Sequence, residues 1–327
     1  MNEPFEPNPA LFARAPGTKP AGRGRDVPPP GNTCVSDRGD THVLVHPLND
    51  PELRMVRDWL LNLDGLGNLV GDAVEDAMYY VLDGWRTHRF DLLDDRVDSD
   101  ERRALGTKLQ YHVLENLGLP KLKHPDTEIL GIGVEIKGTI GSTWAIPTEG
   151  QCGVTLLIQL NLRTRTHKSR LMRTHRAWLN KPNKDGKRGI ASVALADYSI
   201  DLYDRTRLRP NPLQLLGPDQ LDVVFGSRGQ EYRLEHLFVA LPHVVVPRAV
   251  ILTICANRDD PMRRVRAIKP AMRKRDSAML CGKWVPERAA ARRMGHDLTG
   301  AAWVAVPIED ALRAGLLLAE IMDDIKP

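Results

Sequence analysis

Residues 124–137 read His-Pro-Asp-Thr-Glu-Ile-Leu-Gly-Ile-Gly-Val-Glu-Ile-Lys, and this stretch decides the fold around it. Apolar residues at every second position alternate with Gly133, Glu135 and Lys137, which is the period of a β-strand with one buried face. The two glycines predict a tight connection or bulge from a preceding strand, so that Asp126 folds back beside Glu135. We therefore expect Asp126, Glu135 and Lys137 to converge on one polar face.

Two carboxylates and a lysine on one face suit a metal-dependent phosphodiesterase. Carboxylate oxygens are hard ligands for a divalent cation such as Mg²⁺, and a lysine ammonium can hold or polarise the attacking water. A Glu-x-Lys pair is also common on solvated strand faces, so this pattern alone favours an ordinary surface. The rest of the chain shifts the balance towards catalysis.

Length and composition bound the class of protein. A chain of 327 residues predicts two domains, each large enough to bury a core. No apolar run approaches the roughly 18 residues of a membrane span, and the N-terminus lacks the apolar core of a signal peptide, so we expect a cytoplasmic protein without membrane contact. Four cysteines without Cys-x-x-Cys spacing predict reduced thiols, and neither a zinc site nor a disulfide framework: Cys34, Cys152, Cys255 and Cys281.

The expected first domain spans residues 47–205, after a disordered Pro/Gly/Arg-rich tail of residues 1–46. Apolar spacing predicts helices from Asp50, from Leu69 to Leu82 and from Gly106, with the acidic run 91–101 as a solvated loop. The almost continuous apolar run 152–160 predicts the central strand of a sheet covered on both faces. Together these elements predict an α/β (α+β mixed sheet) domain, with the sheet flanked by helices.

A basic stretch, residues 162–188, follows the central strand. Its ten basic residues and single acid are better explained by a surface that contacts phosphates than by an ordinary solvated face. The turn at 183–187 divides the stretch. The predicted DNA-binding residues here are Arg173, Arg176, Lys184, Lys187 and Arg188.

Prolines at 210, 212 and 218 predict a linker, residues 206–218, before a mainly helical second domain, residues 219–327. Within it, 231–241 and 248–256 form a helix, a short turn and a helix, which resembles a helix-turn-helix unit. Two strands and a closing helix, residues 310–325, complete the domain. A second basic cluster follows the helix pair and is expected to bind DNA: Arg258, Arg263, Arg264, Arg266, Lys269, Arg273, Lys274 and Arg275.

The chain resembles the NaeI-type (type IIE) restriction endonucleases, whose nuclease domain belongs to the PD-(D/E)xK superfamily. The resemblance covers residues 47 to 308, and rests on motifs that follow the family in order and spacing. These motifs are Asp83-Gly84-Trp85-Arg86-Thr87, Gly106-Thr107, Asp126 nine residues before Glu135-x-Lys137, Trp144-Ala145-Ile146-Pro147, Ser227-Arg228-Gly229-Gln230, Pro247-Arg248-Ala249-Val250-Ile251 and Met262-Arg263-Arg264-Val265-Arg266.

The resemblance implies a homodimer acting on double-stranded DNA, with a nuclease domain and a second, helix-turn-helix-containing domain that binds another copy of the recognition sequence. It implies Mg²⁺ as the only cofactor, Asp126, Glu135 and Ile136 as metal ligands, and Lys137 as the residue that orients the water. The products would carry 5′-phosphate and 3′-hydroxyl ends.

One departure from the family concerns the helix that begins near Gly106. The family carries a glutamate where this chain has Gln110, whose amide oxygen can still hold a metal's water but brings no charge. Glu115 is a poor substitute, because five residues along a helix rotate it away from the face of Gln110.

The sequence thus favours a sequence-specific, Mg²⁺-dependent double-strand DNA endonuclease, possibly activated by a second DNA site, with Asp126, Glu135, Lys137 and Gln110 as catalytic residues. Two alternatives stay open. One is a DNA-binding regulator or accessory protein whose nuclease site has decayed, and the other is a repair-type nicking endonuclease.

Overall fold

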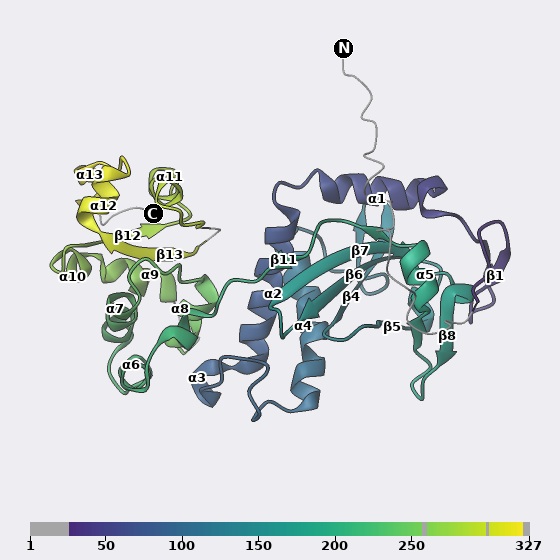
Figure 1. Ribbon diagram of the computed structural model, residues 1–327, viewed down its shortest axis with the longest axis horizontal. Helices are drawn as coiled ribbons and strands as arrows, with labels where there is room; N and C mark the ends of the chain where they lie inside the picture. The colour runs from purple at the N-terminus through teal and green to yellow at the C-terminus, as the bar shows by residue number, and fades with distance from the viewer. Residues whose placement is uncertain (1–25, 257–259, 299–300, 323–327) are drawn as a thin grey trace, which may run out of the picture. The chain divides into compact units, whose positions relative to one another are not determined.

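The computed structural model describes residues 26–256, 260–298 and 301–322, and the chain divides into two compact units (Figure 1). The first unit comprises residues 1–81 and 98–208, and the second comprises residues 82–97 and 209–327. The junction at 208/209 falls inside the segment expected to be a linker. The assignment of residues 82–97 to the second unit was not foreseen, because the helix pattern continues through position 82 without interruption.

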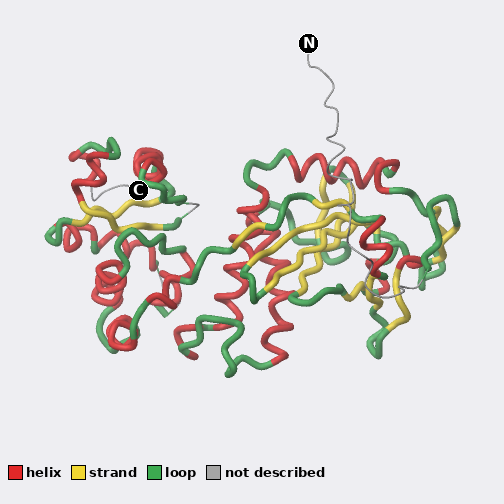
Figure 2. Tube along the Cα trace, viewed as in Figure 1, coloured by secondary structure: helices red, strands yellow, loops and turns green. Residues whose placement is uncertain are grey.

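A mixed six-stranded sheet forms the centre of the first unit, in the order β10-β7-β6-β4-β3 with β11 also on β7. Figure 2 draws the strands in yellow. Only β4 and β6 run parallel, whereas the other neighbours are antiparallel. The predicted central strand is confirmed, since β6 is buried along almost all of its length. The strands are β3 (Thr127–Ile129), β4 (Ile132–Thr139), β6 (Val154–Asn161), β7 (Thr166–Arg173), β10 (Ile200–Asp201) and β11 (Thr206–Arg207).

Helices α2 (Leu66–Leu82) and α4 (Ser99–Asn116) pack together on one face of this sheet. The backbones of α4 and β4 approach closely at two glycines, since a Cβ on Gly106 would lie 3.0 Å from the carbonyl oxygen of Gly138. The start of α4 corrects the expectation of a loop up to residue 101. Asp98 caps the helix and Glu101 completes a capping box, so the last acidic residues of that run form its first turn. Helix α1 (Pro51–Leu61) is capped by Asp50.

The opposite face of the sheet is covered by small elements that enclose one apolar cluster. The cluster includes Cys34 and Leu44, which belong to a hairpin inside the supposed disordered tail. The tail prediction is therefore wrong for residues 26–46, while residues 1–25 lie outside the described part of the chain. The covering elements are β1 (Thr33–Val35), β2 (Thr41–Val43), η2 (Pro47–Asn49), β5 (Ala145–Ile146), η3 (Thr148–Gly150), η4 (Arg176–Trp178), β8 (Leu179–Pro182), β9 (Arg188–Ile190) and α5 (Ser192–Asp197).

The second unit combines short helices with a two-stranded antiparallel sheet, β12 and β13. The expected closing helix over 310–325 is described only up to residue 322, and within that part it is two helices, because Gly315 adopts a φ of +85° that ends the first. The elements are α3 (Gly84–Thr87), η5 (Pro212–Leu215), α6 (Pro218–Val224), α7 (Gln230–Ala240), α8 (Arg248–Ile254), α9 (Pro261–Ala267), α10 (Lys269–Arg273), β12 (Ser277–Cys281), α11 (Val285–Arg293), β13 (Trp303–Pro307), α12 (Ile308–Arg313) and α13 (Leu318–Met322).

Lys269 lies inside this unit and corrects a prediction from the sequence. Its side chain is 4% exposed, with Nζ 3.3 Å from the Glu287 carboxylate and 4.5 Å from the ring centre of Trp284. Glu287 also accepts a hydrogen bond of 2.6 Å from the N–H of Cys281. A lysine held in this way cannot reach a DNA phosphate.

Replacing Lys269 by methionine is expected to destabilise the protein by about 3–5 kcal/mol, because the Glu287 carboxylate stays buried without its counter-ion. The exposed Lys274 is the matched control, and its replacement by methionine should change the unfolding free energy by less than about 0.5 kcal/mol. Urea unfolding followed by tryptophan fluorescence measures both variants. Equal stability of the two variants would contradict the assigned role of the buried pair.

Candidate active site

The hairpin of β3 and β4 positions the predicted acidic residues. Leu130 and Gly131 both have positive φ, +54° and +79°, which is the backbone of a tight two-residue hairpin turn. Gly133 is required for a different reason, because a Cβ at this position would lie 2.6 Å from Cγ of Pro125. The chain before β3 therefore packs directly on β4, and Asp126 comes to lie beside Glu135, as predicted.

Asp126, Glu135 and Lys137 form one cluster. The Nζ of Lys137 lies 2.8 Å from Oε2 of Glu135 and 3.5 Å from Oδ2 of Asp126. The N–H of Ile136 donates a hydrogen bond of 2.9 Å to Oδ2 of Asp126. The side chains of Asp126 and Glu135 are 10% and 6% exposed. The Lys137 side chain is more open than either acid, with 23% of its surface accessible.

The charges in this cluster are mutually balanced. Burial favours the neutral form of Asp126, but hydrogen bonds from Ile136 and Lys121 outweigh it and hold the pKa of Asp126 below its ordinary value. Burial raises the pKa of Glu135, and the neighbouring Asp126 adds to that rise. Burial opposes the charge on Lys137, yet both carboxylates together raise its pKa. Lys137 is therefore an ammonium at neutral pH, which suits a hydrogen-bond donor and not a proton acceptor.

Lys121 is a member of the cluster that the sequence did not reveal. Its Nζ lies 2.9 Å from Oδ1 of Asp126, whereas Lys137 contacts the other oxygen, Oδ2. Two hydrogen bonds close the loop that carries it, from the N–H of Leu122 to Asp126 O and from Oγ1 of Thr127 to Pro120 O. A lysine five residues before the first aspartate was the available signal, but sequence distance alone does not show that the loop folds back.

The residues around Asp126 offer oxygen donors that fit Mg²⁺. Both carboxylates belong to the hard-ligand class that this cation prefers. The side chain of Ile136 is apolar and buried, so only its main-chain carbonyl can contribute. Since the N–H and C=O of one residue point to the same side of a strand, the Ile136 carbonyl points to the edge of β4 where Asp126 lies.

Gln110 is carried by α4, the helix that packs on β4. Its helix, α4, contacts Gly138, and alternation along β4 places Gly138 on the face opposite to Glu135 and Lys137. In the described part of the chain, no hydrogen bond or ion pair joins Gln110 to the three clustered residues, and its buried Nε2 has no partner. A catalytic role for Gln110 remains a prediction.

The basic residues of the first unit divide into paired and exposed side chains. Arg173 is bound by Asp50 and Glu52 at 2.5 and 2.8 Å, which fastens β7 to the start of α1. Arg176 and Arg188 both pair with Asp37 and hold the pKa of that carboxyl well below its usual range. An open pocket of about 520 Å³ is lined by Arg176, Asn180, Lys181 and Arg188. Lys184 and Lys187 are exposed on the turn between β8 and β9.

In the second unit, Arg263 and Lys274 are exposed and Arg266 is half-buried. Arg264 pairs with Glu231 and Arg275 with Glu235, each at 2.9 Å. Arg273 donates a hydrogen bond of 3.3 Å to Ile321 O. Arg258 lies outside the described residues.

Comparison with known proteins defines the class as restriction endonuclease. The model of the family described as "Restriction endonuclease NaeI" matches residues 54–312. This match covers most of the chain, which therefore belongs to the NaeI family of type II restriction endonucleases, the site-specific deoxyribonucleases. A curated relative, the type II restriction enzyme NaeI of Lentzea aerocolonigenes, is 27% identical over 224 residues, or 66% of this chain and 70% of the relative. No helix in the described part of the chain has the length and apolar composition to cross a membrane.

Proposed function

We propose that this chain is a Mg²⁺-dependent, sequence-specific endonuclease that cuts both strands of DNA at the cluster of Asp126, Glu135 and Lys137. The observation that carries the proposal is the convergence of two buried carboxylates and one partly exposed ammonium at the edge of β4. Membership of a restriction endonuclease family supplies the substrate class. The products are expected to carry 5′-phosphate and 3′-hydroxyl ends.

Each residue of the cluster has a separate task in this proposal. Asp126 and Glu135, with the main-chain carbonyl of Ile136, hold the cation. When bound, Mg²⁺ supplies positive charge that offsets the charge growing on the phosphoryl oxygens. Lys137 donates hydrogen bonds that orient the attacking water in line with the phosphorus. Lys121 pairs with Oδ1 of Asp126, the oxygen that Lys137 does not contact, and its positive charge keeps that carboxylate ionised.

Second-unit DNA binding is proposed through α9. The sequence pattern suggested α7 and α8 as the helix-turn-helix pair, but most of α8 is buried and only Arg248 on it is exposed, which leaves little surface for a DNA groove. Helix α9 contacts both α7 and α8 and carries exposed Arg263 and half-buried Arg266. We therefore assign the recognition role to α9, and expect this unit to bind a second copy of the site in a homodimer.

Replacing Arg263 and Arg266 together by alanine should weaken DNA binding about tenfold or more and reduce the magnitude of the slope of log K against log salt by about 2. Fluorescence anisotropy at several salt concentrations measures both quantities. Arg313 is the matched control, because its guanidinium is already paired with Glu309 and Asp310. A slope equal to that of the unmodified protein would remove α9 from the DNA interface.

A supercoiled plasmid tests the proposed reaction and separates it from the alternatives. With Mg²⁺ we expect linear product, whereas EDTA should leave the plasmid intact. Accumulation of nicked circles alone would favour a repair-type nicking enzyme. Specific DNA binding without any Mg²⁺-dependent cleavage would favour a DNA-binding regulator whose nuclease site has decayed. This hypothesis rests on Gln110, which is uncharged where the family carries a glutamate.

A further inference from the structure

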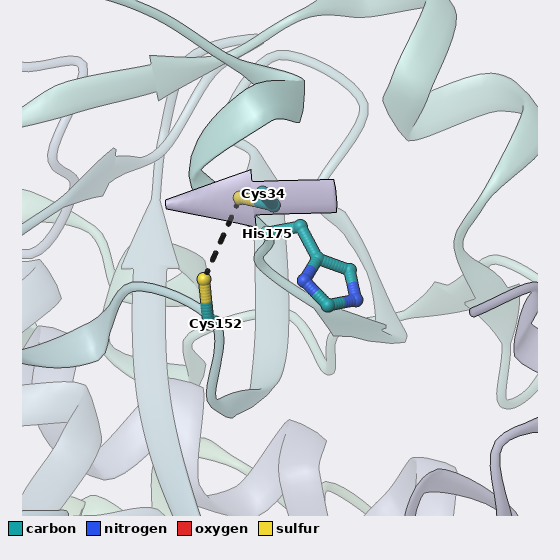
Figure 3. A group of neighbouring side chains, drawn as sticks. All are labelled: Cys34, Cys152 and His175. Carbon is teal, nitrogen blue, oxygen red and sulfur yellow. Dashed lines mark hydrogen bonds between the residues drawn. The ribbon is translucent and has the colours of Figure 1, made fainter. Parts of the chain in front are cut away.

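A second cluster of metal-binding side chains lies in the first unit, formed by Cys34, Cys152 and His175 (Figure 3). One sulfur or nitrogen atom from each residue lies within 4.8 Å of the others. All three side chains are buried, with exposures of 2%, 4% and 1%. None of them belongs to the proposed catalytic cluster.

The fold brings these residues together from distant parts of the sequence. Cys34 is the central residue of β1, Cys152 lies just before β6, and His175 follows β7. Main-chain hydrogen bonds fix the two loop positions, from Cys152 N to Thr174 O at 2.8 Å and from His175 N to Arg173 O at 2.9 Å. The cluster therefore joins the N-terminal hairpin to two strands of the main sheet.

The separation of the two sulfurs suits a shared cation. Cys34 Sγ and Cys152 Sγ are 3.9 Å apart. Two sulfurs at ~2.3 Å from a tetrahedral zinc ion lie ~3.8 Å apart, whereas a disulfide holds them at ~2.05 Å. The N–H of Ala177 donates to Cys34 Sγ at 3.2 Å, a contact of the kind that supports metal-bound thiolates.

The ring nitrogens of His175 have no hydrogen-bonding role among the described residues. Both ring nitrogens are buried and have no hydrogen-bond partner within the described residues. A buried polar group left unpaired costs about 1–3 kcal/mol, and a disulfide between the cysteines would leave it unpaired.

His42 provides a fourth donor next to the cluster. It lies directly opposite Cys34 in the register of β1 and β2, so both side chains lie on the same face of the hairpin. Its Nε2 is buried without a partner in the described structure, and its ring centre is 6.4 Å from that of His175. His42 is not part of the group whose donor atoms lie within 4.8 Å of one another, so its side chain would have to move to become the fourth ligand of a Cys₂His₂ site.

We propose that Cys34, Cys152, His175 and His42 bind one structural Zn²⁺ ion that fastens the β1–β2 hairpin to the nuclease unit. Two thiolates and two neutral imidazoles are the donors of closed, four-coordinate zinc sites. The same hairpin carries Asp37, which pairs with Arg176 and Arg188, so the ion also stabilises one wall of the basic pocket. This proposal replaces the expectation from the sequence that the cysteines hold no metal.

Zinc content of the purified full chain, expressed with added zinc and dialysed without chelator, tests the proposal. We expect about one zinc ion per chain, measured by inductively coupled plasma mass spectrometry. Cys34→Ala and His175→Ala should lose it. Cys255→Ala removes a buried thiol of the second unit and Asp126→Asn alters the Mg²⁺ site, so both should retain it.

Cobalt substitution keeps the test valid if a variant fails to fold. The unmodified chain loaded with Co²⁺ should show sulfur-to-cobalt charge transfer and the visible bands of tetrahedral cobalt. Absence of both bands, or zinc retained by Cys34→Ala and His175→Ala, would overturn the proposal. A Cys34–Cys152 disulfide found in the purified chain would overturn it as well.

Discussion

Replacement of Lys137 by alanine is expected to lower the rate of DNA cleavage by about 10³-fold or more, while the dissociation constant for DNA changes by less than about threefold. The reason is that Lys137 contacts both carboxylates of the proposed metal site, whereas Lys121 contacts Asp126 alone, so Lys137 is the lysine proposed to orient the attacking water. Single-turnover cleavage with saturating enzyme and a binding assay in Ca²⁺ separate the two effects.

Lys121 provides the matched control for this prediction. Its Nζ lies 2.9 Å from Oδ1 of Asp126, the oxygen that Lys137 does not contact. Lys121→Ala should therefore slow cleavage by only about tenfold. If both lysine variants lose activity equally, the cluster needs positive charge in general and Lys137 has no special role. If the Lys137 variant cuts normally, the assigned site is wrong.

Replacement of Asp126 by asparagine is the second large effect, an expected loss of about 10³-fold or more in cleavage at any Mg²⁺ concentration. The amide keeps the shape of the side chain and can still accept the hydrogen bond from Ile136 N–H. It removes the charge that would hold the cation, so the loss reports on metal binding. Cleavage rates measured across a Mg²⁺ titration show this directly.

Asp185 is the matched acidic control, because it lies exposed on the turn between β8 and β9. Its replacement by asparagine should leave the Mg²⁺ titration unchanged. A partial recovery of the Asp126 variant at high Mg²⁺ would indicate that Glu135 holds the cation largely alone. An unchanged titration for the Asp126 variant would refute the proposed ligand set.

The local part of the site was predictable because its information lies within one hairpin. Alternation from 132 to 137 fixed which side chains share a face, and Gly131 marked the turn that returns Asp126 to Glu135. Gly133 was expected to mark a bulge or connection, and it instead makes room for Pro125. Such a contact cannot be distinguished from a turn signal without coordinates.

Contacts between distant segments were not predictable from the sequence. Cys34 and Cys152 are 118 positions apart, and no spacing motif links them. The hairpin around Cys34 looked disordered because its strands have only three residues each and the surrounding composition is rich in proline and glycine. Short strands that gain stability only through tertiary packing leave little periodic signal.

The basic residues also depend on contacts between distant segments that the sequence does not reveal. A run of arginines predicts a phosphate-binding surface from composition, but acids far away in the sequence decide which of them are free. Asp50 forms an ion pair with Arg173, and Asp37 forms ion pairs with both Arg176 and Arg188. Lys269 lies in a basic run that predicts a DNA contact, but its side chain forms a buried ion pair with Glu287.

Digestion of diverse plasmid and phage DNA with the purified protein, in Mg²⁺ or in EDTA, tests the central claim most directly. The account predicts discrete fragments in Mg²⁺, a common sequence at their 5′-phosphorylated ends, and no fragments in EDTA or with Lys137→Ala. Intact DNA under all conditions, together with a specific band shift, would contradict it and identify the chain as a DNA-binding protein with an inactive nuclease site.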